Sequence, residues 1–146
     1  MHGKNYLHRG INPKHILTIV DENKTIVDVK ISGFRYSKSE ELDPKFSQTH
    51  EDYSLWFFDP NAYDEGFSEE SDLWSIGMII YFMAFGAILS KDILELKKIR
   101  NTGIIAFPPN SDDFATKFIN FCIRNRKKGE LAQKIIKEEL AKEKIL

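Results

Sequence analysis

Apolar and β-branched residues gather in two short stretches near the start of the chain. Residues 16–20 read Ile-Leu-Thr-Ile-Val, and residues 25–31 hold four β-branched aliphatic side chains. The four residues between them, 21–24, read Asp-Glu-Asn-Lys and are all polar. Two β-prone runs on either side of a polar turn are typical of a β-hairpin. We therefore predict a hairpin with a four-residue loop.

Helical patterns follow in the second half of the chain. The longest uncharged apolar run, residues 76–89, comes after Ser71 and Asp72, which suit the N-cap and first turn of a helix. We predict a central helix from Ser71 to Leu89, apolar on nearly every face and enclosed by protein. Apolar spacing predicts three more helices: one over 91–100, one capped by Ser111 with Phe114, Phe118, Ile119, Phe121 and Cys122 inward, and an amphipathic one over about 130–144.

The remaining stretches are irregular. Residues 36–54 are polar with little periodicity and are predicted to form a loop, and residues 56–58 are an aromatic island before a turn at Asp59 and Pro60. The predicted fold class is mainly α with a short β-hairpin, in one domain over residues 1–146. The run 76–89 is too short to span a bilayer, so no membrane contact is expected.

Composition narrows the functional classes. The chain has 146 residues, is 42% hydrophobic, and carries 21 Lys and Arg against 22 Asp and Glu, for a net charge of −1. Such a chain lacks the broad positive field of a nucleic-acid-binding protein. The single cysteine, Cys122, excludes an internal disulfide, and the four histidines show no metal-ligand spacing. With no apolar signal segment after Met1, we expect an intracellular, cytoplasmic domain without a metal.

Three segments, read in order, carry a family resemblance. Residues 6–17 read Tyr-Leu-His-Arg-Gly-Ile-Asn-Pro-Lys-His-Ile-Leu, similar to Y-L-H-R-D-I-K-P-E-N-I-L, and residues 29–35 read Val-Lys-Ile-Ser-Gly-Phe-Arg, similar to V-K-I-x-D-F-G. Residues 56–61 and 71–77 are similar to W-Y-x-A-P-E and S-D-x-W-S-x-G. Together they resemble the C-terminal lobe of eukaryotic protein kinases. The pattern over 107–123 is loosely similar to calcium/calmodulin-dependent serine/threonine kinases.

The resemblance implies a truncated kinase-like C-lobe whose chemical groups are replaced. The positions of the catalytic Asp, its Lys, the metal-binding Asn, and the Asp and Gly of D-F-G are taken by Gly10, Asn12, His15, Gly33 and Arg35. A glycine can neither accept a proton nor bind a metal. The Gly-rich loop and strand lysine of the ATP-binding N-lobe do not occur in the sequence. The ATP and Mg²⁺ that the family uses are therefore not expected here.

Other family positions are kept and support a fold. They are His8, Arg9, Phe34, Pro60, Asp72, Trp74 and Gly77. The resemblance implies that Asp72 accepts backbone N–H bonds from the catalytic-loop segment. It also implies that Asn61 has replaced one end of a buried ion pair, so that this pair is expected to be missing.

Arg9 has two interpretations. In the family this arginine binds a phosphate on the loop that here contains Ser47 and Thr49, which are candidate phosphorylation acceptors. Alternatively, Arg9 only holds loop backbone, and we favour this alternative.

The sequence leaves three hypotheses for function. The first is a catalytically inactive, pseudokinase-like module that acts by binding a protein, which covers the surface left by the missing N-terminal helix and N-lobe around Ile79, Ile80 and Met83. The second is a fragment of a serine/threonine protein kinase, an ATP-dependent phosphotransferase, whose N-lobe is missing from this chain. The third is a decaying gene fragment with no selected role.

Overall fold

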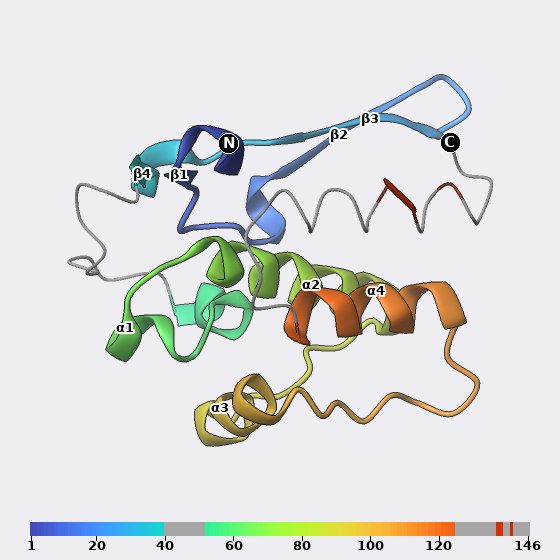
Figure 1. Ribbon diagram of the computed structural model, residues 1–146. Helices are drawn as coiled ribbons and strands as arrows, with labels where there is room; N and C mark the ends of the chain where they lie inside the picture. Colours follow the sequence, from blue (N-terminus) through green and yellow to red (C-terminus); the bar gives the residue numbers. More distant parts are fainter. Residues whose placement is uncertain (40–51, 125–136, 139–140, 142–146) are drawn as a thin grey trace.

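The computed structural model describes residues 1–39, 52–124, 137–138 and 141, and Figure 1 shows their arrangement. Within them the chain is mostly helical with two small antiparallel sheets, as the fold class predicts. The strands are β1 (Tyr6–Leu7), β2 (Ile16–Val20), β3 (Ile26–Ile31) and β4 (Lys38–Ser39). The helices are α1 (Ala62–Glu65), α2 (Glu69–Phe85), α3 (Ile93–Thr102) and α4 (Asp113–Arg124). Short 3₁₀ turns cover His2–Lys4, Pro13–His15, Phe34–Tyr36 and Asp52–Phe57.

The predicted hairpin is confirmed. β2 pairs with β3 antiparallel, with Ile16 opposite Ile31 and Thr18 opposite Val29. The register shifts after Ile19, so Val27 has no direct partner across the hairpin. β1 and β4 form a second, two-residue pair. The segment 8–15 connects β1 to β2 of the hairpin, and it lies above α2 in Figure 1.

The central helix α2 has different ends from those predicted. It begins at Glu69 after the N-cap Ser68. Ser71 is the third residue of the helix, and its hydroxyl accepts the Ser68 N–H at 3.2 Å. The helix ends at Phe85, because Gly86 adopts a left-handed conformation (φ +67°) that glycine accommodates without a Cβ clash. The predicted cap at Ser71 and the predicted end at Leu89 are therefore wrong.

The core lies between α2 and α4. Trp74, Met78, Ile119 and Ile123 are fully buried there. A Cβ at Gly77 would lie 2.8 Å from the Cβ of Cys122, so the glycine permits the two helices to approach closely.

The last turn of α2 is not enclosed by protein, in contrast to the prediction. Ile79 is buried and Ile80 is half-buried, whereas the Met83 side chain is 71% exposed. The uncovered surface expected around these residues and their neighbours therefore lies at Phe82, Met83 and Ala84, all of which are exposed. The helix has polar residues in its first two turns and only apolar ones near its end, so its pattern alone did not separate covered from exposed turns.

The caps of the last two helices are aspartates. Asp92 accepts the Leu94 N–H at 2.8 Å at the start of α3, and Asp112 accepts the Ala115 N–H at 2.7 Å at the start of α4. The predicted cap Ser111 instead donates to the Pro108 carbonyl, so that prediction is wrong. Of the side chains predicted to point inward from α4, Ile119 and Cys122 are buried, and Phe114, Phe118 and Phe121 are half-buried.

Two predictions lie partly outside the described residues. The loop expected over 36–54 holds β4 and the start of the 52–57 turn, and residues 40–51 are not described. Most of the helix expected over 130–144 is likewise not described. The short helix α1 was not predicted. Within the described part of the chain, no helix has the length and apolar character needed to cross a membrane.

Candidate functional site

The segment 8–15, which resembles a kinase catalytic loop, is held by one carboxylate of α2. Asp72, 2% exposed in the first turn, accepts the backbone N–H of His8 at 2.7 Å and that of Arg9 at 2.9 Å. The positive end of the helix favours a carboxylate at this place. These are the bonds that the resemblance implies for this aspartate.

His2 supplies a third contact to the same carboxylate. Its Nε2 lies 2.8 Å from Oδ2 of Asp72. Burial lowers the pKa of His2, but the hydrogen bond to Asp72 and the charge of its carboxylate outweigh burial and raise the pKa above its ordinary value. Nothing in the local sequence around His2 indicates a partner 70 residues away, so this contact was not predicted.

The buried side chain of His8 connects two segments of the chain. Its Nε2 lies 2.9 Å from the Ser32 carbonyl oxygen, to which it donates, and its ring centroid is 5.0 Å from that of Phe34. Burial lowers the pKa of His8 and so favours the neutral imidazole. Its Nδ1 is buried without a hydrogen-bond partner in the described structure. His8 and Phe34 thus join the 8–15 segment to the segment after β3.

Three of the replaced positions bind one another. The Gly10 carbonyl accepts from His15 Nδ1 at 2.6 Å and from Asn12 Nδ2 at 3.1 Å. The Asn12 side-chain oxygen accepts the Lys14 N–H at 2.9 Å, which caps the turn at 13–15. The polar groups of Asn12 and His15 therefore serve the loop's own backbone.

Gly33 also lies against the His15 ring. Its φ is +82°, and a Cβ there would lie 2.4 to 2.5 Å from three atoms of the imidazole, which no real Cβ contact allows. A side chain at position 33 would need both a rare backbone conformation and the space that His15 fills. Gly10 and Gly33 therefore both contact the His15 imidazole. Neither glycine has a side chain that could accept or donate a proton.

The remaining predicted site residues are spread around this centre. The Arg9 guanidinium is buried 5.2 Å above the ring of Phe67, and that of the exposed Arg35 lies 5.8 Å from the ring of Tyr36. Ser47 and Thr49 lie outside the described residues. Within the described part of the chain, no three His, Cys, Asp or Glu side chains gather in a way that could hold a metal ion.

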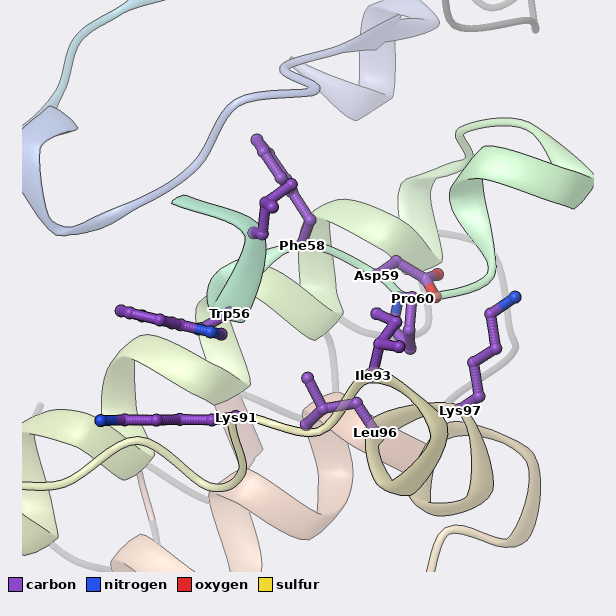
Figure 2. A pocket seen from close by; sticks show the side chains of 9 residues that line it. Trp56, Phe58, Asp59, Pro60, Lys91, Ile93, Leu96 and Lys97 are labelled. Atoms are coloured by element: carbon purple, nitrogen blue, oxygen red, sulfur yellow. The ribbon is translucent and has the colours of Figure 1, made fainter. Parts of the chain in front are cut away.

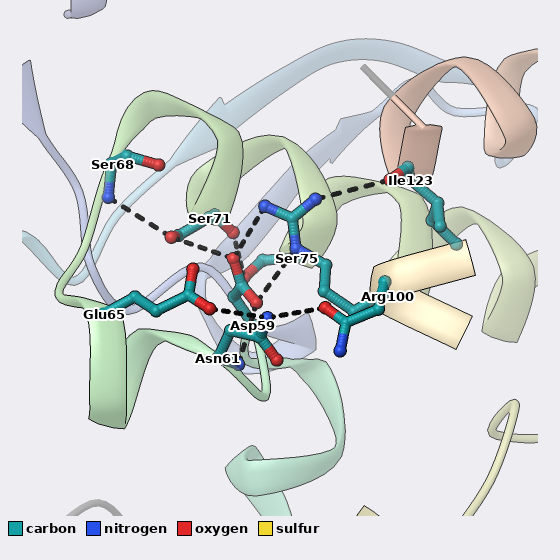
Figure 3. A network of polar contacts seen from close by, with 9 residues as sticks. Asp59, Asn61, Glu65, Ser68, Ser71, Ser75, Arg100 and Ile123 are labelled. Atoms are coloured by element: carbon teal, nitrogen blue, oxygen red, sulfur yellow. Dashed lines mark hydrogen bonds and ion pairs between the residues drawn. The ribbon is translucent and has the colours of Figure 1, made fainter. Parts of the chain in front are cut away.

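A buried ion pair that sequence analysis did not find ties three segments together (Figure 3). Arg100 of α3 binds Asp59 through two parallel contacts of 2.9 and 3.0 Å, and both side chains are under 9% exposed. Ser71 donates to the same carboxylate at 3.0 Å. The Arg100 guanidinium also lies 5.7 Å from the centroid of the buried Trp74 ring, and Pro60, which follows Asp59 in the chain, is buried as well.

Asn61 itself forms no ion pair within the described residues, so the prediction for this position is not contradicted. The Asn61 side chain donates to Glu65 and Asn101, but a buried pair is present two residues earlier in the chain, at Asp59. The signal that could have revealed it is an acidic residue inside an aromatic segment, where an unpaired charge is costly.

A pocket of about 470 Å³ lies beside this pair, between the 55–60 segment and α3. Figure 2 shows Trp56, Ile93 and Leu96 around it, with Lys91 and Lys97 on two sides. The remaining lining residues are Leu55, Phe58, Asp59 and Pro60. Lys91 lies 5.8 Å from the Trp56 ring, and Lys97 binds Asp64 at the surface. The pocket is therefore apolar at its centre and basic at its rim.

Comparison with known proteins shows partial similarity to kinases and kinase-related proteins. No family model matches the chain. The chain is 31% identical over 56% of its length to the tyrosine-protein kinase receptor svh-2 of Caenorhabditis elegans, and 30% identical over 66% to that organism's STE20-related kinase adapter protein strd-1. It is 29% identical over 59% to calcium-dependent protein kinase 4 of Plasmodium falciparum (isolate 3D7). The matches span 7%, 26% and 16% of these relatives. The relation is therefore kinase-like over part of the chain.

Proposed function

We propose that this chain is a catalytically inactive, pseudokinase-like module that acts by binding another protein. The observation that carries the proposal is the packing of the His15 ring against Gly33. At the position where the resemblance implies a metal-binding carboxylate there is no side chain, and the neighbouring imidazole fills the space that one would need. Without a base or metal ligands, the charge that develops during phosphoryl transfer has nothing to compensate it.

Retention of the framework supports a selected role for the fold. Asp72 binds two backbone N–H groups of the loop and His8 reaches the Ser32 carbonyl, although no chemistry at Gly10 or Gly33 depends on them. One of the similar proteins is named a kinase adapter. A fold kept without its reactive groups fits a binding role better than an enzymatic one.

Incubation of the purified chain with labelled ATP, Mg²⁺ and a general protein substrate tests the inactivity. We expect no transfer above a blank without the chain. The control is a mock preparation, purified in the same way from cells that do not express the chain. Transfer that scales with the amount of chain and is absent from the mock preparation would overturn the proposal, whereas equal transfer in the two preparations comes from a contaminating kinase.

The pocket of Figure 2 is the place where we expect a protein partner to insert an apolar side chain. A photo-crosslinking residue at Ile93 lines the pocket, and the same residue at Leu94 lies one position along α3, outside the lining and 72% exposed. We expect a partner to be crosslinked from position 93 and much less from position 94. Equal yields would show that binding does not use the pocket.

The kinase-fragment hypothesis is favoured by a different observation. Similar proteins named as kinases are much longer than this chain, which spans 7% to 26% of the relatives described above. Coding sequence upstream of Met1 with a Gly-rich loop and a strand lysine would support a fragment. Even then, Gly10 and Gly33 predict weak or no transfer.

A further inference from the structure

In the part of the chain that the structure describes, no strand pairs with the outer edge of β3. All six residues of β3 are exposed, and within the described residues β3 pairs only with β2. Figure 1 shows the hairpin as an extended arm, with its turn at the far end from β1 and β4. A two-stranded hairpin is marginally stable in water, and an open edge is a template for another strand.

The alternation of hydrogen bonds between β2 and β3 shows which backbone N–H and C=O groups of β3 point to its outer edge. Ser32 donates its N–H to the His15 carbonyl at 2.8 Å, one position beyond the Ile16–Ile31 pair. Bonded and non-bonded pairs alternate along an antiparallel ladder. Val29, opposite Thr18, is therefore in a non-bonded pair, and its N–H and C=O point away from β2. Its N–H is indeed bound by the Asp28 side chain at 2.8 Å.

The charges along β3 are complementary to those of a second copy of β3 that runs antiparallel to it. Residues 27–31 read Val-Asp-Val-Lys-Ile, so an acidic and a basic residue flank Val29 symmetrically. If a second copy pairs antiparallel with Val29 opposite Val29, each Asp28 faces the Lys30 of the other copy. A shift that centres the pairing on residue 28 or residue 30 instead sets like charges against each other, which destabilises a sheet.

We propose that two copies of this chain associate through the β3 edge, antiparallel and centred on Val29, to form a four-stranded sheet. The Val29 N–H and C=O of each copy bond to those of the other, and Asp28 turns from the Val29 N–H to Lys30 of the second copy. In this register the charged pairs occupy non-bonded positions, where side chains come closest. The proposal uses only the hairpin, so it does not depend on the proposed function.

The local charges allow this exchange. Asp28 and Lys30 contact each other within one strand at 3.4 Å, with side chains 48% and 64% exposed. Such charges on an edge discourage pairing with most strands. The same charges match a second copy in the register described, so one pair of residues both rejects other strands and selects this one.

Sedimentation equilibrium of the full chain tests the association. We expect a monomer–dimer equilibrium with a dissociation constant between about 10 µM and 1 mM, the weak range for a small interface. Asp28→Lys or Lys30→Asp alone sets like charges opposite each other twice, and should weaken association about tenfold. Mixing the two variants restores opposite charges in the mixed pair, so a heterodimer should form.

Proline variants test which edge is used. Val29→Pro removes an N–H that points to the β3 edge and should abolish association, while Thr18→Pro removes the equivalent N–H on the outer edge of β2 and should leave it unchanged. Far-ultraviolet circular dichroism confirms that each variant is folded. A wild-type chain that stays monomeric at about 1 mM, single charge variants that associate as strongly as wild type, or a mixture that does not recover association would each overturn the proposal.

Discussion

At the scale of single residues, the candidate site is defined by the packing of the His15 ring against Gly33. The imidazole donates to the Gly10 carbonyl and at the same time fills the volume beside Gly33. The two positions are therefore coupled, and a side chain cannot be restored at position 33 while His15 keeps its place.

A double-mutant cycle measures this coupling. Gly33→Ala should lower the free energy of unfolding by about 2–4 kcal/mol, because it combines left-handed strain with a steric clash. The matched control is Gly86→Ala, whose φ is also left-handed (+67°) but whose Cβ would meet nothing within 4 Å. It should cost about 1–2 kcal/mol.

In a His15→Ala background, the cost of Gly33→Ala should fall to that of Gly86→Ala, as read from urea denaturation. An unchanged cost in that background would show that His15 does not occupy the space beside Gly33.

His2 gives a prediction on pH. Its pKa is raised in the folded state by Asp72, so its protonation stabilises the fold below the unfolded pKa of about 6.5, and this stability is lost as the pH rises through the folded pKa. His2→Gln keeps a neutral donor but does not titrate. The loss of stability in His2→Gln should be larger at about pH 5.5 than at about pH 8.5.

His8 acts in the opposite direction, since its lowered pKa favours the fold at higher pH, but it is present in both proteins and cancels in the difference. A loss of stability that is equal at both pH values would argue against the His2–Asp72 contact.

At the scale of elements, the Asp59–Arg100 pair fastens the segment before α1 to α3. Four donors reach the Asp59 carboxylate, from Arg100 twice, from Ser71 and from the Asn61 N–H. A buried carboxylate that loses its cation is left uncompensated, which is more damaging than the net contribution of the intact pair.

Arg100→Met should therefore lower the free energy of unfolding by about 3–5 kcal/mol. Lys97→Met removes the neighbouring exposed pair with Asp64 from the same helix, and should cost about 1 kcal/mol or less. Denaturation followed by tryptophan fluorescence measures both. Similar losses in the two variants would contradict the burial and geometry of the Asp59 pair.

The sequence predicted those helices and strands that are determined by neighbouring residues in the chain. The hairpin was found because β-branched runs flank a polar turn, and α3 because its apolar spacing is helical. The ends of α2 were missed because Ser68 and Ser71 are both good caps and only the backbone shows which one begins the helix.

In the candidate site, too, the sequence indicated local features but not contacts between distant segments. Motif resemblance indicated the positions of Gly10, His15 and Gly33, but the ring of His15 against Gly33 depends on two segments meeting in space. The Asp59–Arg100 pair joins residues 41 apart in sequence, and no short pattern connects them.

At the scale of the whole molecule, the main core lies around α2 and α4, and a smaller cluster joins Leu7, Ala62 and Phe67. All six residues of β3 in the hairpin are exposed. Cys122, the single cysteine, lies in the main core and is fully buried. Burial raises the pKa of its thiol to about 12, so the reactive thiolate is scarce in the folded protein.

Reaction of Cys122 with a thiol reagent thus reports whether the chain folds by itself. At about pH 8 we expect slow labelling without denaturant, and acceleration in urea that follows the loss of tryptophan fluorescence. Labelling as fast as that of an unfolded peptide, in the absence of urea, would show that the α2–α4 core does not form in this chain alone.

The central claim is that the His15 ring, in the kinase-like segment 8–15, fills the space beside Gly33. The resemblance implies a metal-binding carboxylate at that position. The most direct measurement is a nuclear Overhauser spectrum of the labelled chain in solution. We predict strong cross-peaks between the His15 ring proton on Cδ2 and the Gly33 Hα protons, because the ring carbon lies 2.4 Å from where a Gly33 Cβ would be. Absence of these cross-peaks in a folded sample, with Gly33 near no aromatic ring, would contradict the account.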